Sequence, residues 1–306
     1  MRAAVIGIGS NSVRMLAADI DGSAGVRILR DRAATRLFAG LDSERRLSAE
    51  SMQRTAAAAG TMAARARAAG AETVRVFATS ATRDAVNGAD FLRVLNRCTA
   101  AEAEILSGES EAALSFIGAG DGGHCGVIDI GGGSTEIVLG EGMDIHASCS
   151  CQMGAVRLFR LLSIDSRRDV ETAVMAARGV LRDGIAEQPL LVSEKPDSWW
   201  GTGGTFTALA ALALRVPWTE RTDMHRTMLT RERVRAEAES LADMTVEERL
   251  RIPSLQPGRA DIVVHGICIL LACMEELSVD RITVSESGNL DGYLKWRFGL
   301  TSLRNA

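Results

Sequence analysis

The fold is decided by the stretch VIGIGSNS at residues 5–12, which returns as VIDIGGGS at residues 127–134. Each copy is an apolar run of β type, followed by a Gly-rich turn that ends in Ser and by a second apolar run. The second runs are VRMLAA at residues 13–18 and TEIVL at residues 135–139. The repeat predicts two related halves, each of which opens with a β-hairpin.

Both turns are rich in backbone N–H donors and hydroxyl groups and almost free of bulky side chains. Such turns allow main-chain N–H groups to approach an anion closely. Two of them facing each other would grip phosphate from two sides. The first turn does not match the dinucleotide-binding pattern, because Ser12 replaces the third Gly and an extended segment follows instead of a helix. A purely structural tight turn remains the alternative for that copy alone.

Composition narrows the classes of function. The 306 residues have room for two ordinary domains with a sizeable core. The formal net charge of -4 argues against a nucleic-acid partner, which usually requires a broad basic excess. No apolar run reaches transmembrane length, and Met1 and Arg2 lead straight into a predicted strand. We therefore expect no signal peptide, no membrane partner and a cytoplasmic location.

The predicted elements follow the same order in both halves. A strand meander precedes alternating helices and strands, and this pattern buries best as a layered α/β domain. In the first half, Ser48 is expected to cap a long helix that ends at Gly70. A Gly-rich loop marks the boundary between domains at residues 1–122 and 123–306, leaving open whether the last helix packs back on the first domain. The strands of the first meander are expected at residues 3–8, 13–20, 25–31 and 34–39.

Three consecutive glycines, Gly131 to Gly133, follow the apolar run of the second copy. Such a run is expected where the backbone lies against a ligand. Asp129 ends that strand and Glu136 lies on the return strand, so two carboxylates flank the loop. They are candidates to hold Mg²⁺, partly through water. The alternative is that Asp129 caps the turn and Glu136 is a solvated strand residue.

A third Gly-rich turn reads GTGGT at residues 201–205, follows a short strand and opens a helix. Helix N-termini bind anions through their N–H groups and the helix dipole. Among the six cysteines, Cys149 and Cys151 have the spacing of neighbours on one face of a strand. They fit a plain structural role, with a redox pair or a metal fragment as alternatives.

Together these motifs resemble the exopolyphosphatase/guanosine pentaphosphate phosphatase family. The resemblance implies duplicated actin-like (ribonuclease H-like) α/β domains, as in the actin, sugar-kinase and Hsp70 superfamily, with an interdomain active-site cleft. The length is similar to that of the short, two-domain members. The matching segments run in order over nearly the whole chain: GSNSVR at 9–14, ATSATRDA at 78–85, ILSGESEA at 105–112, DIGGGSTE at 129–136, GTGGT at 201–205 and PGRAD at 257–261.

The resemblance also implies roles for single residues. Glu111 stands at the position of the catalytic base, and its alternative role is that of a helix N-terminal acid favoured by the dipole. Arg83 matches a phosphate-binding Arg, and its alternative is a solvated turn residue. His265, within an apolar run, is interpreted as a core histidine. The other expected substrate- or phosphate-binding residues are Ser10, Asn11, Ser12, Arg14, Gly131, Gly132, Gly133, Ser134, Gly203, Gly204 and Arg259.

The activity implied is Mg²⁺-dependent hydrolysis of phosphoanhydride bonds. Release of terminal phosphate from inorganic polyphosphate is the first hypothesis, and removal of the 5′-phosphate of guanosine pentaphosphate is the alternative within the family. A polyphosphate- or alarmone-binding sensor and an ATP-dependent sugar kinase are rivals from other classes. The oligomeric state stays open, with a homodimer as one alternative.

Two departures from the family pattern put activity, metal affinity or substrate choice in question. The family usually has Asp where Gly7 stands, and in related folds that Asp helps to hold the metal. Residues 288–292 read GNLDG, where the family usually has Gly-Leu-Arg-Glu-Gly. The fold is not affected by either departure. The first one favours the sensor hypothesis.

Overall fold

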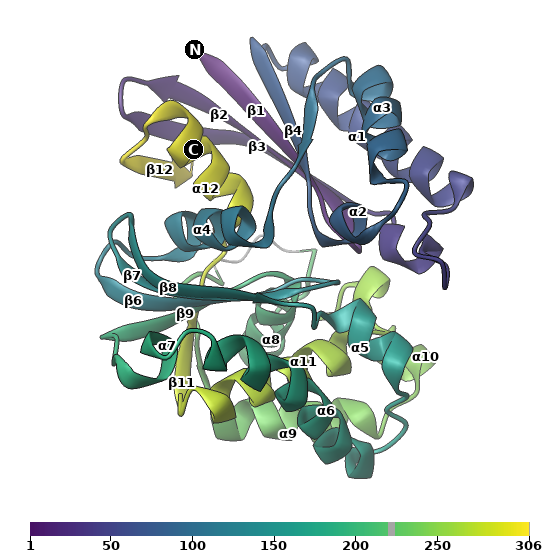
Figure 1. Ribbon diagram of the computed structural model, residues 1–306, viewed down its shortest axis with the longest axis vertical. Helices are drawn as coiled ribbons and strands as arrows, with labels where there is room; N and C mark the ends of the chain where they lie inside the picture. Colours follow the sequence, from purple (N-terminus) through teal and green to yellow (C-terminus); the bar gives the residue numbers. More distant parts are fainter. Residues whose placement is uncertain (220–223, 306) are drawn as a thin grey trace. The chain divides into compact units, whose positions relative to one another are not determined.

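The repeated segment forms the same hairpin in both halves of the chain. In the computed structural model, β1 (Arg2–Ile8) pairs antiparallel with β2 (Ser12–Asp21). Likewise, β6 (His124–Ile130) pairs antiparallel with β7 (Thr135–Glu141). The predicted duplication is therefore confirmed (Figure 1).

The structure describes residues 1–219 and 224–305, and the chain divides into two units. Unit 1 comprises residues 1–118 and 289–306, and unit 2 comprises residues 119–288. The first crossing between units lies at 118/119, where we expected 122/123. The Gly-rich loop belongs to unit 2, and its Gly122 carbonyl lies 4.0 Å from a Cβ built on Gly142, in the turn after β7.

Unit 1 is built on a six-stranded sheet with the order β12-β3-β2-β1-β4-β5. β1 runs parallel to β4 (Thr73–Ala78), which runs parallel to β5 (Ala103–Ile105). β2 and β3 (Ala24–Ala34) complete the meander. The chain returns at its end, since β12 (Ser302–Asn305) pairs parallel with β3. Figure 1 shows this return in yellow.

The helices of unit 1 pack on its sheet. Ser48 caps α1 (Ala49–Ala68) as expected, because its Oγ accepts from the Ser51 N–H at 3.2 Å. A buried cluster with Phe77 and Leu290 joins the sheet to the two helices α4 and α12. α1 instead packs against α3, β1 and β2. The remaining helices are α2 (Ser80–Asp84), α3 (Gly88–Thr99), α4 (Gly108–Ala119) and α12 (Asn289–Phe298).

The strand expected at residues 34–39 is wrong. β3 runs on to Ala34, and the chain then forms a 3₁₀ helix, η1 (Leu37–Gly40). Arg36 adopts a left-handed conformation with φ 51°, which ends the extended run. The Phe38 N–H donates to the Ser10 carbonyl at 2.9 Å, so the apolar residues of this segment are buried against the first turn instead of within the sheet.

Unit 2 repeats the arrangement with a six-stranded sheet of order β10-β11-β9-β6-β7-β8. β6 runs parallel to β9 (Ser198–Thr202), which runs parallel to β11 (Arg281–Val284). β8 (Asp144–Cys151) pairs antiparallel with β7, and β10 (Met228–Thr230) pairs antiparallel with β11. The two units thus share one α/β plan, and the expected duplication of α/β domains is confirmed.

The core of unit 2 centres on α11 (Val263–Glu276), whose residues 263–274 are all buried. α11 packs against α5, α6, α8 and α9. The 3₁₀ helix η2 (Pro257–Arg259) precedes α11 in the chain. In the described parts of the chain, no helix combines the length and the apolar character needed to cross a membrane. The other helices of unit 2 are α5 (Ala155–Leu161), α6 (Arg167–Ala186), α7 (Leu190–Ser193), α8 (Gly204–Leu214), α9 (Arg231–Ala242) and α10 (Val246–Arg249).

Candidate active site

Three parallel strands of unit 1 end at the same edge of its sheet. Ile8 of β1 lies opposite Ala78 of β4, and Ala78 lies opposite Ile105 of β5. The Thr79 N–H donates to the Ile8 carbonyl at 3.1 Å, and the Leu106 N–H donates to the Ala78 carbonyl at 2.9 Å. The segments that follow the three strands therefore start side by side. Ligands bind at this edge in many α/β sheets.

The segment after β1 is a tight turn that backbone hydrogen bonds hold in place. The Gly9 N–H donates to the Ser12 carbonyl at 3.0 Å, and the Asn11 carbonyl accepts from the Arg36 N–H at 2.9 Å. Ser10, Asn11 and Ser12 are all buried. These three predicted phosphate-binding residues are thus fixed at the edge where β1 ends.

The segments after β4 and β5 bring Arg83 and Glu111 together. Arg83 lies in α2, and Glu111 lies in the first turn of α4. Nη1 of Arg83 donates to Oε2 of Glu111 at 3.2 Å and to the Leu106 carbonyl at 2.9 Å. The side chains are only 20% and 9% exposed, respectively. Arg83 is therefore not a solvated turn residue, and Glu111 is a buried acid with a cation beside it.

Arg83 keeps a second nitrogen for another acceptor. Its Nη2 is buried and has no hydrogen-bond partner among the residues that the structure describes. The same holds, within residues 1–219 and 224–305, for Oγ of Ser80 and Oγ1 of Thr82. A buried donor without a partner costs about 1–3 kcal/mol, and a phosphate oxygen would satisfy it. Ser80 and Thr82 are not among the site residues predicted from the sequence, although both lie in the family segment that contains Arg83.

Arg14 lies away from the turn itself, beside the first turn of α12. Its Nη2 donates to Oδ1 of Asn289 at 3.0 Å. Asn289 and Asp291 belong to the segment that departs from the family pattern. Asp291 is buried and forms an ion pair with Arg27 at 2.7 Å, so the acid at this position has a structural role.

Gly7 is enclosed by apolar side chains. A Cβ built on Gly7 would lie 2.9 Å from Cδ2 of Leu290 and 3.0 Å from Cζ of Phe77. Leu290 and Phe77 are both buried. The two departures from the family pattern therefore touch each other, since Leu290 stands where the family usually has Arg. This contact favours accommodation of Gly7 by repacking.

Three parallel strands of unit 2 also end at one edge. Asp129 of β6 lies opposite Thr202 of β9, and Gly201 of β9 lies opposite Val284 of β11. The glycine-rich segments that follow β6 and β9 therefore start side by side. This edge of the unit 2 sheet corresponds to the edge that carries Arg83 and Glu111 in unit 1. In each unit, it is the edge at which the parallel strands end.

The turn after β6 repeats the geometry of the first turn. The Gly131 N–H donates to the Ser134 carbonyl at 3.0 Å, the same distance as between Gly9 and Ser12. The Gly132 carbonyl accepts from the Val156 N–H at 2.9 Å, at the start of α5. Further contacts join Gly131 and Gly133 to α5. The Gly-rich backbone is thus rigid before any ligand binds.

Asp129 and Glu136 lie directly opposite each other in the β6–β7 pair. Opposed residues of an antiparallel pair place their side chains on the same face, with Cβ atoms about 4.5–5.5 Å apart. Both carboxylates are buried. Oε1 of Glu136 accepts from the Ser150 hydroxyl at 2.9 Å. The alternative that Glu136 is a solvated strand residue is therefore wrong.

The third Gly-rich turn brings Asp129 and Arg259 next to glycine backbone. Gly203 has φ +99°, and a Cβ built on it would lie 2.9 Å from Oδ1 of Asp129. A Cβ built on Gly204 would lie 1.7 Å from Cζ of Arg259. Only glycine allows these approaches. Four predicted residues of unit 2 therefore lie close together at the start of α8, namely Asp129, Gly203, Gly204 and Arg259.

Each of the two units has the same α/β plan, with tight turns held by backbone hydrogen bonds and buried charged side chains after its parallel strands. A model of the Ppx/GppA phosphatase family matches residues 16–295. The chain therefore belongs to this family, whose members hydrolyse phosphoanhydride bonds.

Curated relatives and solved structures agree with this membership. The chain is 36% identical to exopolyphosphatase 2 of Mycobacterium tuberculosis, over 95% of this chain and 97% of that protein. It is 34% identical to the guanosine-5′-triphosphate,3′-diphosphate pyrophosphatase of Vibrio vulnificus, over 94% of this chain but 58% of that protein. A solved exopolyphosphatase-like protein has a TM-score of 0.87 at 26% identity, covering 96% of this chain and 98% of its own. The Ppx/GppA family member of Aquifex aeolicus has a TM-score of 0.76 at 27% identity, covering 97% of both chains.

Proposed function

We propose that the protein is a Mg²⁺-dependent exopolyphosphatase, which releases terminal phosphate from inorganic polyphosphate. The observation that carries the proposal is the buried Arg83–Glu111 pair at the edge where β1, β4 and β5 end. Nη2 of Arg83 supplies a buried donor for a phosphate oxygen. Glu111 supplies a carboxylate that can accept a proton from water. A phosphate-binding cation beside a general base is what hydrolysis of a phosphoanhydride requires.

In this mechanism, a water molecule attacks the terminal phosphorus of the chain. Glu111 orients that water and accepts its proton, while the bond from phosphorus to the bridging oxygen breaks. The products are inorganic phosphate and a polyphosphate shorter by one unit. Arg83 stabilises the charge on the transferred phosphoryl group through charge-assisted hydrogen bonds. Within unit 1, the fixed turn Ser10–Ser12 provides further phosphate contacts.

Asp129 and Glu136 fit a magnesium site by their donor chemistry. They are two buried carboxylates on one face of a hairpin, and Mg²⁺ prefers oxygen donors from one or two carboxylates together with water and phosphate. When bound, the ion would offset negative charge on the phosphates. Arg259 on Gly204 adds a cation to the same unit.

Polyphosphate is the first substrate to test, because the chain is 36% identical to a relative named exopolyphosphatase and 34% identical to a relative named for the guanosine substrate. The repacked Gly7 is the observation that keeps a catalytically weakened sensor as the second candidate. A sensor would bind polyphosphate without turnover.

Phosphate release from polyphosphate and from guanosine pentaphosphate, measured side by side with and without Mg²⁺, tests the proposal. We expect Mg²⁺-dependent release with higher kcat/KM for polyphosphate. Higher kcat/KM for guanosine pentaphosphate would support the alternative within the family. Binding of polyphosphate without release would support the sensor, and ADP formation from ATP and a sugar would support a kinase.

We also propose a cytoplasmic location, because all six cysteines are free thiols. Free thiols are typical of a reducing compartment. We further propose a homodimer. Light scattering should then give the mass of two chains, and the mass of one chain would contradict the proposal.

A further inference from the structure

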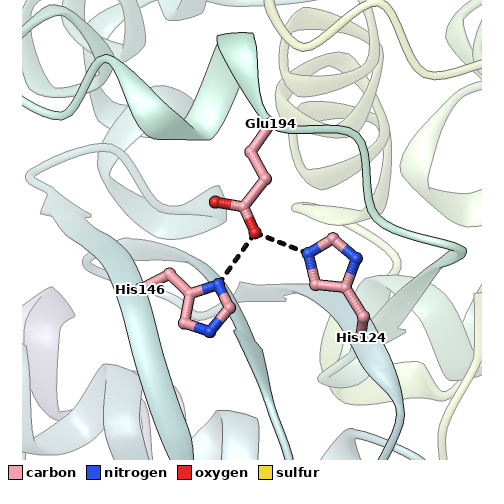
Figure 2. A group of neighbouring side chains, drawn as sticks. All are labelled: His124, His146 and Glu194. Atoms are coloured by element: carbon pink, nitrogen blue, oxygen red, sulfur yellow. Dashed lines mark hydrogen bonds and ion pairs between the residues drawn. The ribbon is translucent and has the colours of Figure 1, made fainter.

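Three side chains of unit 2 that the proposed mechanism does not use converge on one point. His124 is the first residue of β6, His146 lies near the start of β8, and Glu194 follows α7. Figure 2 shows both imidazole rings directed at the same carboxylate oxygen. The three residues are separated by 22 and 48 positions in the chain, so no sequence motif indicates the cluster.

Both imidazole rings lie at hydrogen-bonding distance from the Glu194 carboxylate. Nε2 of His124 lies 2.6 Å from Oε1 of Glu194, and Nδ1 of His146 lies 2.8 Å from the same oxygen. All three ligand atoms lie within 4.8 Å of one another. The side chains are 24%, 30% and 26% exposed, so an ion can reach them from solvent.

The cluster is separate from the candidate active site. His124 opens β6, whereas Asp129 stands near its other end, five positions further on. At about 3.3 Å per residue along a strand, these two positions are about 17 Å apart. Among the residues that the structure describes, this trio is also the one group of three His, Cys, Asp or Glu side chains close enough to share an ion.

We propose that His124, His146 and Glu194 bind a zinc ion, with solvent in the fourth position. Two imidazoles and one carboxylate form a known ligand combination for tetrahedral Zn²⁺. Imidazole nitrogen favours zinc and its transition-metal neighbours over the magnesium expected for phosphate chemistry. Binding requires each N···O separation to widen to about 3.4 Å and the two ring nitrogens to lie at the same spacing, which is that of ligands about 2.1 Å from a tetrahedral ion.

The surroundings of the cluster favour a cation. Asp144 and Glu141 are near enough to act electrostatically on His146, which adds negative charge around the three ligands. The hydrogen bond from His146 holds the pKa of Glu194 below its usual value. A plain hydrogen-bonded ion pair is therefore the competing interpretation.

Zinc would tie three separate segments of unit 2 together. The Asp197 N–H donates to the His124 carbonyl at 3.0 Å, so the segment after Glu194 already lies against the start of β6. An ion that binds the folded state and not the unfolded chain raises the melting temperature by mass action. The site would thus stabilise the sheet without entering the phosphatase reaction.

Titration calorimetry with Zn²⁺ on the full chain, after dialysis against a chelator, tests the proposal. We expect one equivalent of Zn²⁺ to bind and to raise the melting temperature by about 5 °C, and we expect Mg²⁺ at the same concentration not to compete for this site. Absorption of bound Co²⁺ in the visible range would report a tetrahedral site. His146→Ala and Glu194→Gln should each weaken Zn²⁺ binding at least about tenfold.

Two matched controls separate this site from other zinc ligands. His225→Gln removes a histidine that stacks on Trp200 outside the cluster, and Cys149→Ser removes a thiol of the same unit. Both controls should bind Zn²⁺ like the wild type. Phosphate release at saturating Mg²⁺ should be unchanged in His146→Ala, so the result is independent of the proposed phosphatase function. Absence of stoichiometric binding, equal binding by His146→Ala, or loss of binding in Cys149→Ser would each overturn the proposal.

Discussion

Replacing Gly7 with Asp restores the acid that the family usually has, and we expect it to destabilise the protein. The new Cβ would lie 2.9 Å from Leu290 and 3.0 Å from Phe77, so these neighbours must shift. Overpacking of this kind costs about 1–3 kcal/mol. A carboxylate placed among apolar side chains without a partner costs about 1–3 kcal/mol more. The sum is about 2–6 kcal/mol, which lowers the melting temperature by at least about 4 °C.

Thermal unfolding of three variants separates the cost of overpacking from the cost of the buried carboxylate. The variants are Gly7→Ala, Gly7→Asp and Gly7→Asp/Leu290→Arg. Gly7→Ala carries only the overpacking, so the difference between it and Gly7→Asp measures the carboxylate. Burial raises the pKa of a carboxyl group, so the extra cost should shrink as the pH falls and the acid becomes neutral. The double variant supplies the Arg of the family pattern and should recover stability. Wild-type melting of Gly7→Asp, together with a lower Mg²⁺ requirement for phosphate release, would refute the repacking argument.

Three further outcomes follow from the same contacts. Asp129→Asn should need at least about tenfold more Mg²⁺ for phosphate release, because one of the two carboxylates is lost. Asp121 is an exposed acid, so Asp121→Asn should need the same Mg²⁺ concentration as the wild type. Arg83→Lys should lower kcat/KM for polyphosphate by about 5- to 150-fold, since an ammonium cannot replace both guanidinium contacts; an unchanged value would remove Arg83 from the site. Burial lowers the pKa of His265 from 6.5 to about 4. As the pH falls from 6.5 towards 4, only the unfolded chain gains this proton, so the wild type should lose about 3 kcal/mol of stability and His265→Gln should lose less. Parallel acid-unfolding curves of the two proteins would contradict this assignment.

The hairpins and most helices could be predicted because their signals are local. Two copies of one pattern predict two hairpins, and Ser48 before an Ala-rich run predicts the start of α1, where the structure has it. The strand predicted at residues 34–39 failed because hydrophobic alternation does not reveal the left-handed turn at Arg36. The pairing of β12 with β3 depends on residues nearly 280 positions apart, which no local pattern reports.

The site shows the same division between local and distant information. The Gly-rich turns were visible in the sequence because their composition is unusual. The contact between Arg83 and Glu111 joins two helices that follow different strands, and it emerges only when β4 and β5 pair. The apolar side chains around Gly7 include Leu290, from the far end of the chain. The histidine–glutamate cluster depends on a similar convergence of distant segments.

The most direct test of the central claim is the single-turnover rate of phosphate release from polyphosphate by Glu111→Gln, with Glu109→Gln as the control. Glu109 lies in the same first turn of α4 but is exposed, so it experiences the same helix dipole without the contact to Arg83. Loss of a positioned general base should lower the rate of Glu111→Gln by about 10²–10⁴, whereas Glu109→Gln should stay within about twofold of the wild type. Melting temperatures and polyphosphate binding should be nearly unchanged in both variants. If Glu111→Gln keeps more than about a tenth of the wild-type rate, Glu111 is not the base and the account of catalysis is wrong.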